Sequence, residues 1–113
     1  MNQMTSVSSL YGSGEYREKG HVVTGTIALG AHRLCLQEGG DDIAATYIPL
    51  EKIKKIRRTF RGLRITVRLS PVKTYTTLIA GTKAGLTALT RDLIDRRNLK
   101  KRFFLPEWFD ETG

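Results

Sequence analysis

Residues 25–56 hold three short runs in which apolar and polar side chains alternate, with turn-forming residues between the runs. Alternation of this kind predicts strands with one buried and one exposed face. Residues 30–32 have the right length for a tight hairpin, and residues 38–42, rich in glycine and aspartate, predict a second reversal. Pro49 has no N–H group to give to a sheet and is expected to end the third strand. The stretch therefore predicts three successive antiparallel strands around one core.

Further strands are predicted on both sides of this stretch. Residues 63–69 alternate without a break, which predicts the clearest strand of the chain, half buried as in an antiparallel sheet. Residues 57–60 predict a strand before it, with residues 61–62 as the turn, and residues 72–80 predict one after it. Residues 13–23 predict a first strand or the two sides of a first hairpin, since Gly25 suits either a bulge in one long bent strand or the start of a second.

The spacing of the apolar residues changes after residue 82. They then recur at steps of three and four, at Leu86, Leu89, Leu93 and Ile94. This spacing predicts an amphipathic helix that begins after the N-cap Thr82 and ends near Asn98. Six to seven strands followed by one helix predict a mainly β (α+β) fold, in which the C-terminal helix caps the open end of a bent antiparallel barrel.

The chain is expected to form a single domain over residues 1–113, because this length suffices for one packed core and not for two. The core is expected over about 14–98, after a flexible arm (1–13) and before a basic and aromatic tail (99–113). One cysteine, Cys35, cannot form an internal disulfide, which favours a reducing, cytoplasmic compartment. No secretory signal or long apolar run is present, so any membrane contact is expected to be peripheral.

The charge of the chain is distributed unevenly. The net charge of +8 combines −3 over residues 1–51 with +11 over residues 52–113. Between Lys52 and Lys73 there are nine basic side chains and no carboxylate. Such a run indicates either a surface for an anionic partner or a solvated face.

Within this run, alternate positions of two neighbouring strands are expected to bring arginines to one face. The candidate anion- or lipid-binding residues are Arg57, Arg61, Arg64, Arg68 and Lys73. Arginine suits phosphate, whether on a lipid headgroup, a nucleic acid or a phosphopeptide. Nucleic acid is the less favoured partner, because only Phe60 offers a ring for base stacking among these cations.

The tail joins a basic cluster to an aromatic one, and Pro106 argues against one continuous helix through it. Its candidate protein-interaction or membrane-binding residues are Lys100, Lys101, Arg102, Phe103, Phe104, Trp108 and Phe109. Cations at the headgroups and rings at the interface would suit an anionic bilayer. Packing back on the barrel or onto a neighbouring subunit is favoured, because free aromatic side chains promote aggregation.

The sequence offers little for catalysis. His21, His32 and Cys35 fall short of a zinc pattern, and a structural role for the lone cysteine is favoured over a thiol–imidazole pair. Residues 81–83 are better explained as an ordinary helix cap than as an anion site. We therefore expect no enzyme activity, no metal and no cofactor.

Three segments resemble the pattern of pleckstrin-homology-like domains, in particular GRAM, GLUE and bacterial members. They are GTIAL at residues 25–29, RLCL at 33–36 and IPLEKI at 48–53, and the resemblance runs over about residues 14–98. It implies a bent antiparallel barrel capped by the C-terminal helix, and a binding function rather than a catalytic one.

Two functions are expected from these observations. The first is that of an adaptor that binds a protein partner or its own copies through an edge strand or the aromatic tail. The alternative is peripheral attachment at the inner face of a membrane, by contact of residues 52–73 and 100–102 with anionic, phosphoinositide-like lipid.

Overall fold

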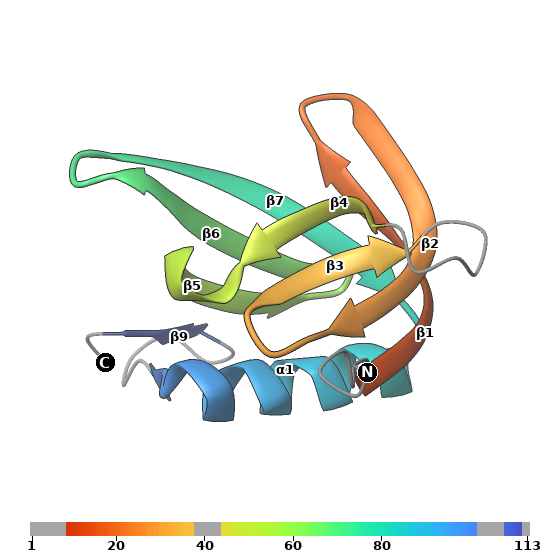
Figure 1. Ribbon diagram of the computed structural model, residues 1–113. Helices are drawn as coiled ribbons and strands as arrows, with labels where there is room; N and C mark the ends of the chain where they lie inside the picture. The colour runs from red at the N-terminus through yellow and green to blue at the C-terminus, as the bar shows by residue number, and fades with distance from the viewer. Residues whose placement is uncertain (1–8, 38–43, 102–107, 112–113) are drawn as a thin grey trace, which may run out of the picture.

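One antiparallel sheet and one α-helix form the fold in the computed structural model, which describes residues 9–37, 44–101 and 108–111 (Figure 1). The elements are β1 (Ser9–Glu18), β2 (His21–Leu29), β3 (Arg33–Gln37), β4 (Ala44–Pro49), the 3₁₀ helix η2 (Leu50–Lys52), β5 (Ile53–Thr59), β6 (Gly62–Ser70), β7 (Lys73–Gly81), α1 (Lys83–Arg97), β8 (Lys100–Lys101) and β9 (Trp108–Asp110). The strands are ordered β4-β3-β2-β1-β7-β6-β5-β9-β8. Neighbouring strands run antiparallel throughout this order.

The predicted mainly β fold with one C-terminal helix is confirmed, but the sheet is not closed into a barrel. The described strands begin at the β4 edge and end at the β8 edge, and the sheet bends around the core between them. The described residues form nine strands rather than six or seven, because residues 100–101 and 108–110 of the tail add two short ones. Strand β1 begins at Ser9, so residues 9–13 belong to the sheet and not to an N-terminal arm.

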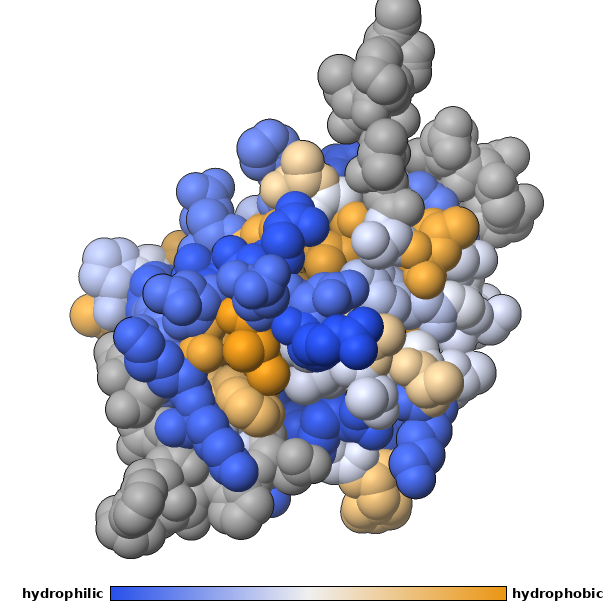
Figure 2. Space-filling view, turned by 90° about the horizontal axis from the view of Figure 1, so that it is seen from below, coloured by the Kyte–Doolittle hydropathy of each residue, from blue (hydrophilic) through white to orange (hydrophobic). Residues whose placement is uncertain are grey.

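The core lies between the bent sheet and α1, which crosses the open end of the sheet (Figure 1). Its fully buried large side chains are Ile27, Leu29, Leu34, Leu36, Ile48, Ile53, Ile56, Leu63, Ile65, Ile79, Leu89 and Leu93. Those on β6 alternate with Arg64 and Thr66, as predicted, and those on α1 come from the predicted apolar stripe. Each such side chain contributes roughly 1.5–3 kcal/mol by leaving water. Seen from the helix side, the surface is mainly hydrophilic with a few hydrophobic residues between (Figure 2).

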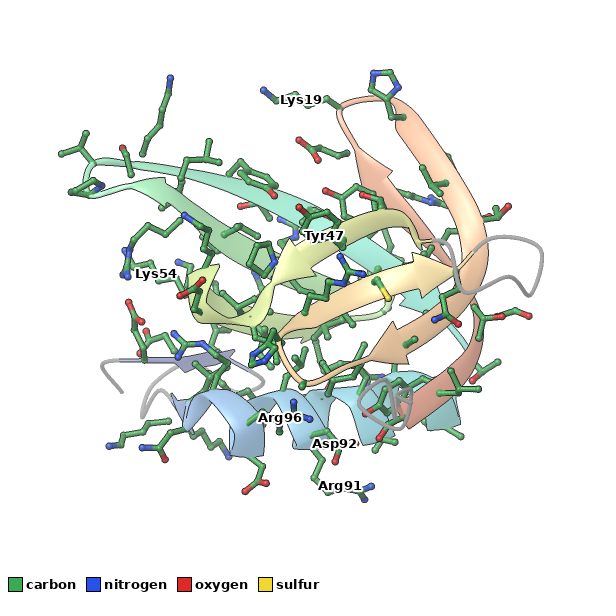
Figure 3. The ribbon with its side chains drawn as sticks, viewed as in Figure 1. Lys19, Tyr47, Lys54, Arg91, Asp92 and Arg96 are labelled. Carbon is green, nitrogen blue, oxygen red and sulfur yellow. The ribbon has the colours of Figure 1, made fainter. Side chains whose placement is uncertain are left out.

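Both predicted helix boundaries are confirmed. The Thr82 side chain accepts a hydrogen bond from the backbone N–H of Gly85 at 3.0 Å, and Asn98 ends the helix in a left-handed conformation with φ 53°. Near its C-terminal end Arg96 donates to the carbonyl oxygens of Gly30 (2.7 Å) and Ala31 (3.0 Å), which ties α1 to the β2–β3 turn (Figure 3). Helix α1 is too short and too polar to span a membrane.

The first turns of α1 lie unusually close to β1. A Cβ atom placed on Gly85 would lie 2.2 Å from the carbonyl oxygen of Tyr11, so only glycine fits there. The phenol of Tyr11 is buried and donates a 2.6 Å hydrogen bond to Asp92 Oδ2. Burial and this hydrogen bond raise the pKa of Tyr11 to about 12.

Tyr11→Phe is expected to lower the free energy of unfolding at neutral pH by about 1–2 kcal/mol, since the hydrogen bond to a carboxylate is lost. The folded-state pKa of Tyr11 lies above the value of 10 expected in the unfolded chain. Its contribution to stability is therefore complete below pH 10 and is lost as the pH rises from 10 to 12. Urea unfolding at pH 7, 10 and 12 should show the difference between variant and wild type shrinking over that interval. A constant difference would contradict the assignment, and Tyr47→Phe at an exposed position is the control.

Candidate anion-binding site

Strands β5 and β6 bring two of the predicted arginines face to face. Arg57 and Arg64 are direct cross-strand partners, next to the buried pair Ile56 and Ile65. Because side chains alternate along a strand, the two arginines lie on the outer face of the sheet while the isoleucines face the core. Lys55, two residues before Arg57, falls on the same outer face. This part of the sheet surface is therefore cationic.

Strand β9 adds an aromatic ring to this cationic face. Trp108 is the partner of Arg57 in the β5–β9 pair. Its ring centroid lies 4.5 Å from the Lys55 Nζ atom and 5.1 Å from the Arg57 Cζ atom. A hollow of about 160 Å³ beside the ring is lined by Lys55, Ile56, Arg57, Arg64, Thr66, Thr76 and Trp108. The predicted basic run and the predicted aromatic tail thus meet in one site, which we call the Trp108 site.

The electrostatics of the Trp108 site favour an anion. Three cationic side chains line a hollow of that size, and their mutual repulsion is relieved when a negative group enters between them. Arg64 is exposed and makes no ion pair within the described residues. Guanidinium groups and the threonine hydroxyls offer hydrogen bonds to tetrahedral oxygens. The arrangement suits one phosphate-sized group among the three cations, two of which lie over the Trp108 ring.

Arg68, the next basic residue of β6, has a structural partner. Its guanidinium donates to Glu111, whose second carboxylate oxygen also pairs with Arg97 at 3.2 Å. The backbone N–H of Glu111 bonds to the Lys54 carbonyl oxygen at 3.1 Å. Glu111 thus joins β6, the end of α1 and β5, and its one carboxylate is shared between Arg68 and Arg97.

The remaining two cations of the predicted set lie at opposite ends of β6. Arg61 is in the β5–β6 turn, with its Cζ atom 5.6 Å from the centroid of the Phe60 ring. Lys73 begins β7 after the β6–β7 turn. The length of β6 separates the two turns by roughly 27 Å. The five predicted residues therefore do not form one site: Arg57 and Arg64 meet, and the others lie apart.

The predicted tail residues do not form one site either. Lys100 and Lys101 form β8, Trp108 lies in the site and Phe109 packs against the core. Arg102, Phe103 and Phe104 lie outside the described residues.

Sequence reasoning missed Lys55 and the two threonines of the Trp108 site. The alternation of side chains along a strand nevertheless places Lys55 on the same face as Arg57. The pairing of Trp108 with β5 had no local sequence signal.

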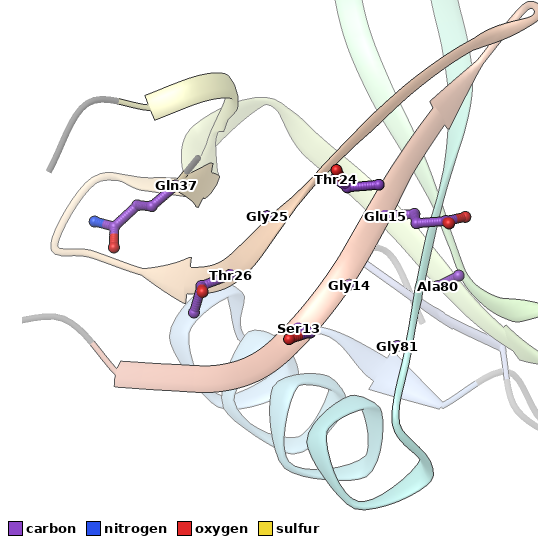
Figure 4. A pocket seen from close by; sticks show the side chains of 9 residues that line it. All are labelled: Ser13, Gly14, Glu15, Thr24, Gly25, Thr26, Gln37, Ala80 and Gly81. Atoms are coloured by element: carbon purple, nitrogen blue, oxygen red, sulfur yellow. The ribbon is translucent and has the colours of Figure 1, made fainter. Parts of the chain in front are cut away.

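A wider, shallow groove of about 630 Å³ crosses β1, β2 and β7 (Figure 4). Gly14 and Gly25 face each other at its centre, and Glu15 is the one carboxylate in its lining. That carboxylate accepts hydrogen bonds from Arg17 at 2.6 and 2.9 Å. The groove is therefore polar and almost neutral, without the convergent acid, base and nucleophile that catalysis requires.

Other reactive groups do not form a site. Within the described ranges, no three His, Cys, Asp or Glu side chains lie close enough to hold a metal ion. Burial raises the pKa of the Cys35 thiol, which makes it less reactive.

Comparison of the chain with protein-family models, curated proteins and solved structures gives no match.

Proposed function

We propose that this chain is a non-catalytic binding domain that attaches to an anionic, phosphate-bearing membrane surface through the outer face of β5 and β6. The observation that carries the proposal is the Trp108 site, where Lys55, Arg57 and Arg64 surround a hollow beside an indole ring. Tryptophan is enriched at membrane–water interfaces, and each Lys or Arg near an anionic leaflet contributes about 1 kcal/mol to binding. The proposed location is the cytoplasmic face of a membrane, which carries anionic lipid.

The position of the tail favours a membrane over a protein partner. Trp108 and Phe109 belong to β9, which pairs with β5 of the same chain. Phe109 is packed against the core and Glu111 bonds two arginines, so these residues are already used within the fold. Packing of Phe109 within the fold makes this side chain less suited to capturing a second protein, which supports a membrane surface over a protein partner.

The fold is compatible with the pleckstrin-homology-like architecture, which we keep as a proposal. An antiparallel sheet bent around one core, with a helix after the seventh strand packed across its open end, supports it. The proposed membrane contact uses the outer face of the sheet, where the Trp108 site lies, and does not require a deep ligand-binding cleft.

Vesicle co-sedimentation tests the proposed function. The protein is mixed with phosphatidylcholine vesicles and with vesicles that also contain phosphatidylserine or a phosphoinositide, at about 0.1 M salt and at several-fold higher salt. We expect binding to the anionic vesicles only, and a strong decrease at high salt, since exposed charges are screened. Equal binding to neutral vesicles, or none to either, would contradict the proposal.

Self-association through β4 is a second candidate. Strand β4 forms one edge of the described sheet, and such an edge offers peptide groups to a further strand. Tyr47 on this strand is 53% exposed, with Arg33 at 4.9 Å from its ring. Light scattering after gel filtration, over a wide range of protein concentration, decides the matter. A monomer at every concentration would exclude this candidate.

A further inference from the structure

The end of the β6–β7 hairpin carries two apolar side chains into solvent. Leu69 is 54% exposed and Val72 is 96% exposed, on either side of Ser70 and Pro71. We call residues 69–73 the hairpin tip. The β6–β7 hairpin extends beyond the neighbouring strands, on the side away from most of α1 (Figure 1). The tip therefore presents its apolar side chains at a projecting end of the molecule.

Val72 is unusual for a turn residue, and Leu69 lies in the last residues of β6. Tight turns favour Gly, Asn, Asp, Ser and Pro, each for a conformational reason that a valine or leucine does not share. Leu69 continues the alternation that buries Val67, but it lies past the end of the core and cannot be covered by it. Two exposed apolar side chains at one projecting end suit contact with another apolar phase.

Three lysines lie at the hairpin tip or on the same side of the molecule. Lys73 belongs to it, Lys52 is exposed next to it, and Lys54 projects on the same side (Figure 3). A hollow of about 370 Å³ behind the tip is lined by Glu51, Lys52, Arg68, Leu69, Ser70 and Pro71. Glu51 is the one carboxylate in that lining, and of the two cations there Arg68 is paired with Glu111 while Lys52 is exposed. An apolar tip with lysines beside it matches the profile of an anionic bilayer, which is apolar inside and negative at its surface.

We propose that the hairpin tip inserts Leu69 and Val72 into the interfacial region of an anionic bilayer, with Lys52, Lys54 and Lys73 at the headgroups. This inference rests on the proposed function and adds the depth and orientation of the contact. A protein partner fits the tip less well, because a stable interface buries about 800 Å² on each side and a narrow convex tip cannot supply that area. In a tilted approach the tip enters the bilayer while the Trp108 site faces the headgroups.

Phe60 provides a matched control. It is 96% exposed, the same fraction as Val72, but it lies in the β5–β6 turn at the other end of β6. Two proteins are prepared in a Cys35→Ala background, one with Val72→Cys and one with Phe60→Cys, and each is labelled with the environment-sensitive dye NBD. On addition of phosphatidylserine-containing vesicles, the dye at position 72 is expected to shift to the blue and to become protected from iodide. The dye at position 60 is expected to change little.

The outcomes separate this inference from the proposed function. If the unlabelled protein binds anionic vesicles but the dye at position 72 does not respond, insertion of the tip is wrong and electrostatic attachment stands. Equal responses at both positions also overturn insertion, because they indicate a sheet lying flat on the surface. If the unlabelled protein binds no vesicles, both proposals fail.

A second pair of variants tests the energetic role of the tip. Leu69→Ser combined with Val72→Ser is expected to weaken vesicle binding by about tenfold or more, because two apolar side chains no longer leave water. Phe60→Ser should leave binding unchanged. If the double variant instead changes the molecular mass of the lipid-free protein in light scattering, the tip contacts a second copy of the chain and the bilayer proposal is wrong.

Discussion

Replacing Arg57 and Arg64 together by glutamate is expected to abolish binding to anionic vesicles. Each change reverses one charge in the Trp108 site, which corresponds to about 2 kcal/mol if each basic residue contributes about 1 kcal/mol at the membrane surface. The two changes together then weaken binding by roughly a thousandfold. Both side chains are exposed on the outer face, so the fold should remain intact. Co-sedimentation measures the effect, and circular dichroism with urea unfolding verifies the fold.

A matched control changes the same charge elsewhere. Lys83 and Arg91 are exposed on α1, and Arg91 points away from the sheet (Figure 3). Changing both to glutamate alters the net charge by the same amount as the Arg57 and Arg64 pair. If this control loses binding to the same extent, attachment depends only on net charge, and the Trp108 site has no special role.

Gly85→Ala is expected to destabilise the protein by about 2 kcal/mol or more, although alanine favours helix formation by about 1 kcal/mol over glycine. The reason is that the new Cβ atom has too little space. It would lie 2.2 Å from the Tyr11 carbonyl oxygen and 2.9 Å from Thr82 Oγ1. The first of these is a backbone atom within a sheet strand and cannot turn aside. Relief of the contact requires α1 to move away from β1, which opens the core.

The neighbouring exposed residue Ala84 supplies the comparison. Ala84→Gly removes a good helix former and should cost at most about 1 kcal/mol. Urea unfolding of the two variants should therefore show the larger loss for the change that improves helix propensity. A gain in stability for Gly85→Ala would mean that α1 does not approach β1 as closely as described.

The elements of the fold were predictable where local pattern decides them. The alternation of residues 63–69 gives β6, and the apolar stripe with Thr82 and Asn98 gives α1 with both boundaries. The number of strands was not predictable, because β8 has two residues and β9 has three. Such short segments contain too few residues for an alternation of apolar and polar side chains to be recognised. Closure of the barrel depends on contacts between strands distant in sequence, and no local signal reports it.

Half of the candidate site followed from sequence as well. Pairing of Arg57 with Arg64 follows from the register of a hairpin, which a turn at residues 61–62 sets. Trp108 joins them through a strand pair some fifty residues apart, and Arg68 is paired by Glu111 at a separation of 43 residues. Such contacts depend on the folded topology. A list of the cations in the sequence therefore includes Arg68, which is ion-paired, and does not show that Trp108 belongs to the site.

The place of β9 next to β5 has a consequence for synthesis of the chain. Strand β5 ends at Thr59 and its partner begins only at Trp108. At a synthesis rate of about 5–20 residues per second, the outer edge of β5 stays uncovered for roughly 2–10 s on each nascent chain. An uncovered strand edge pairs readily with a neighbouring polypeptide. The lysines and arginines along β5 give all nascent chains the same positive charge at that edge. Repulsion between these charges disfavours pairing of two nascent chains before β9 is synthesised.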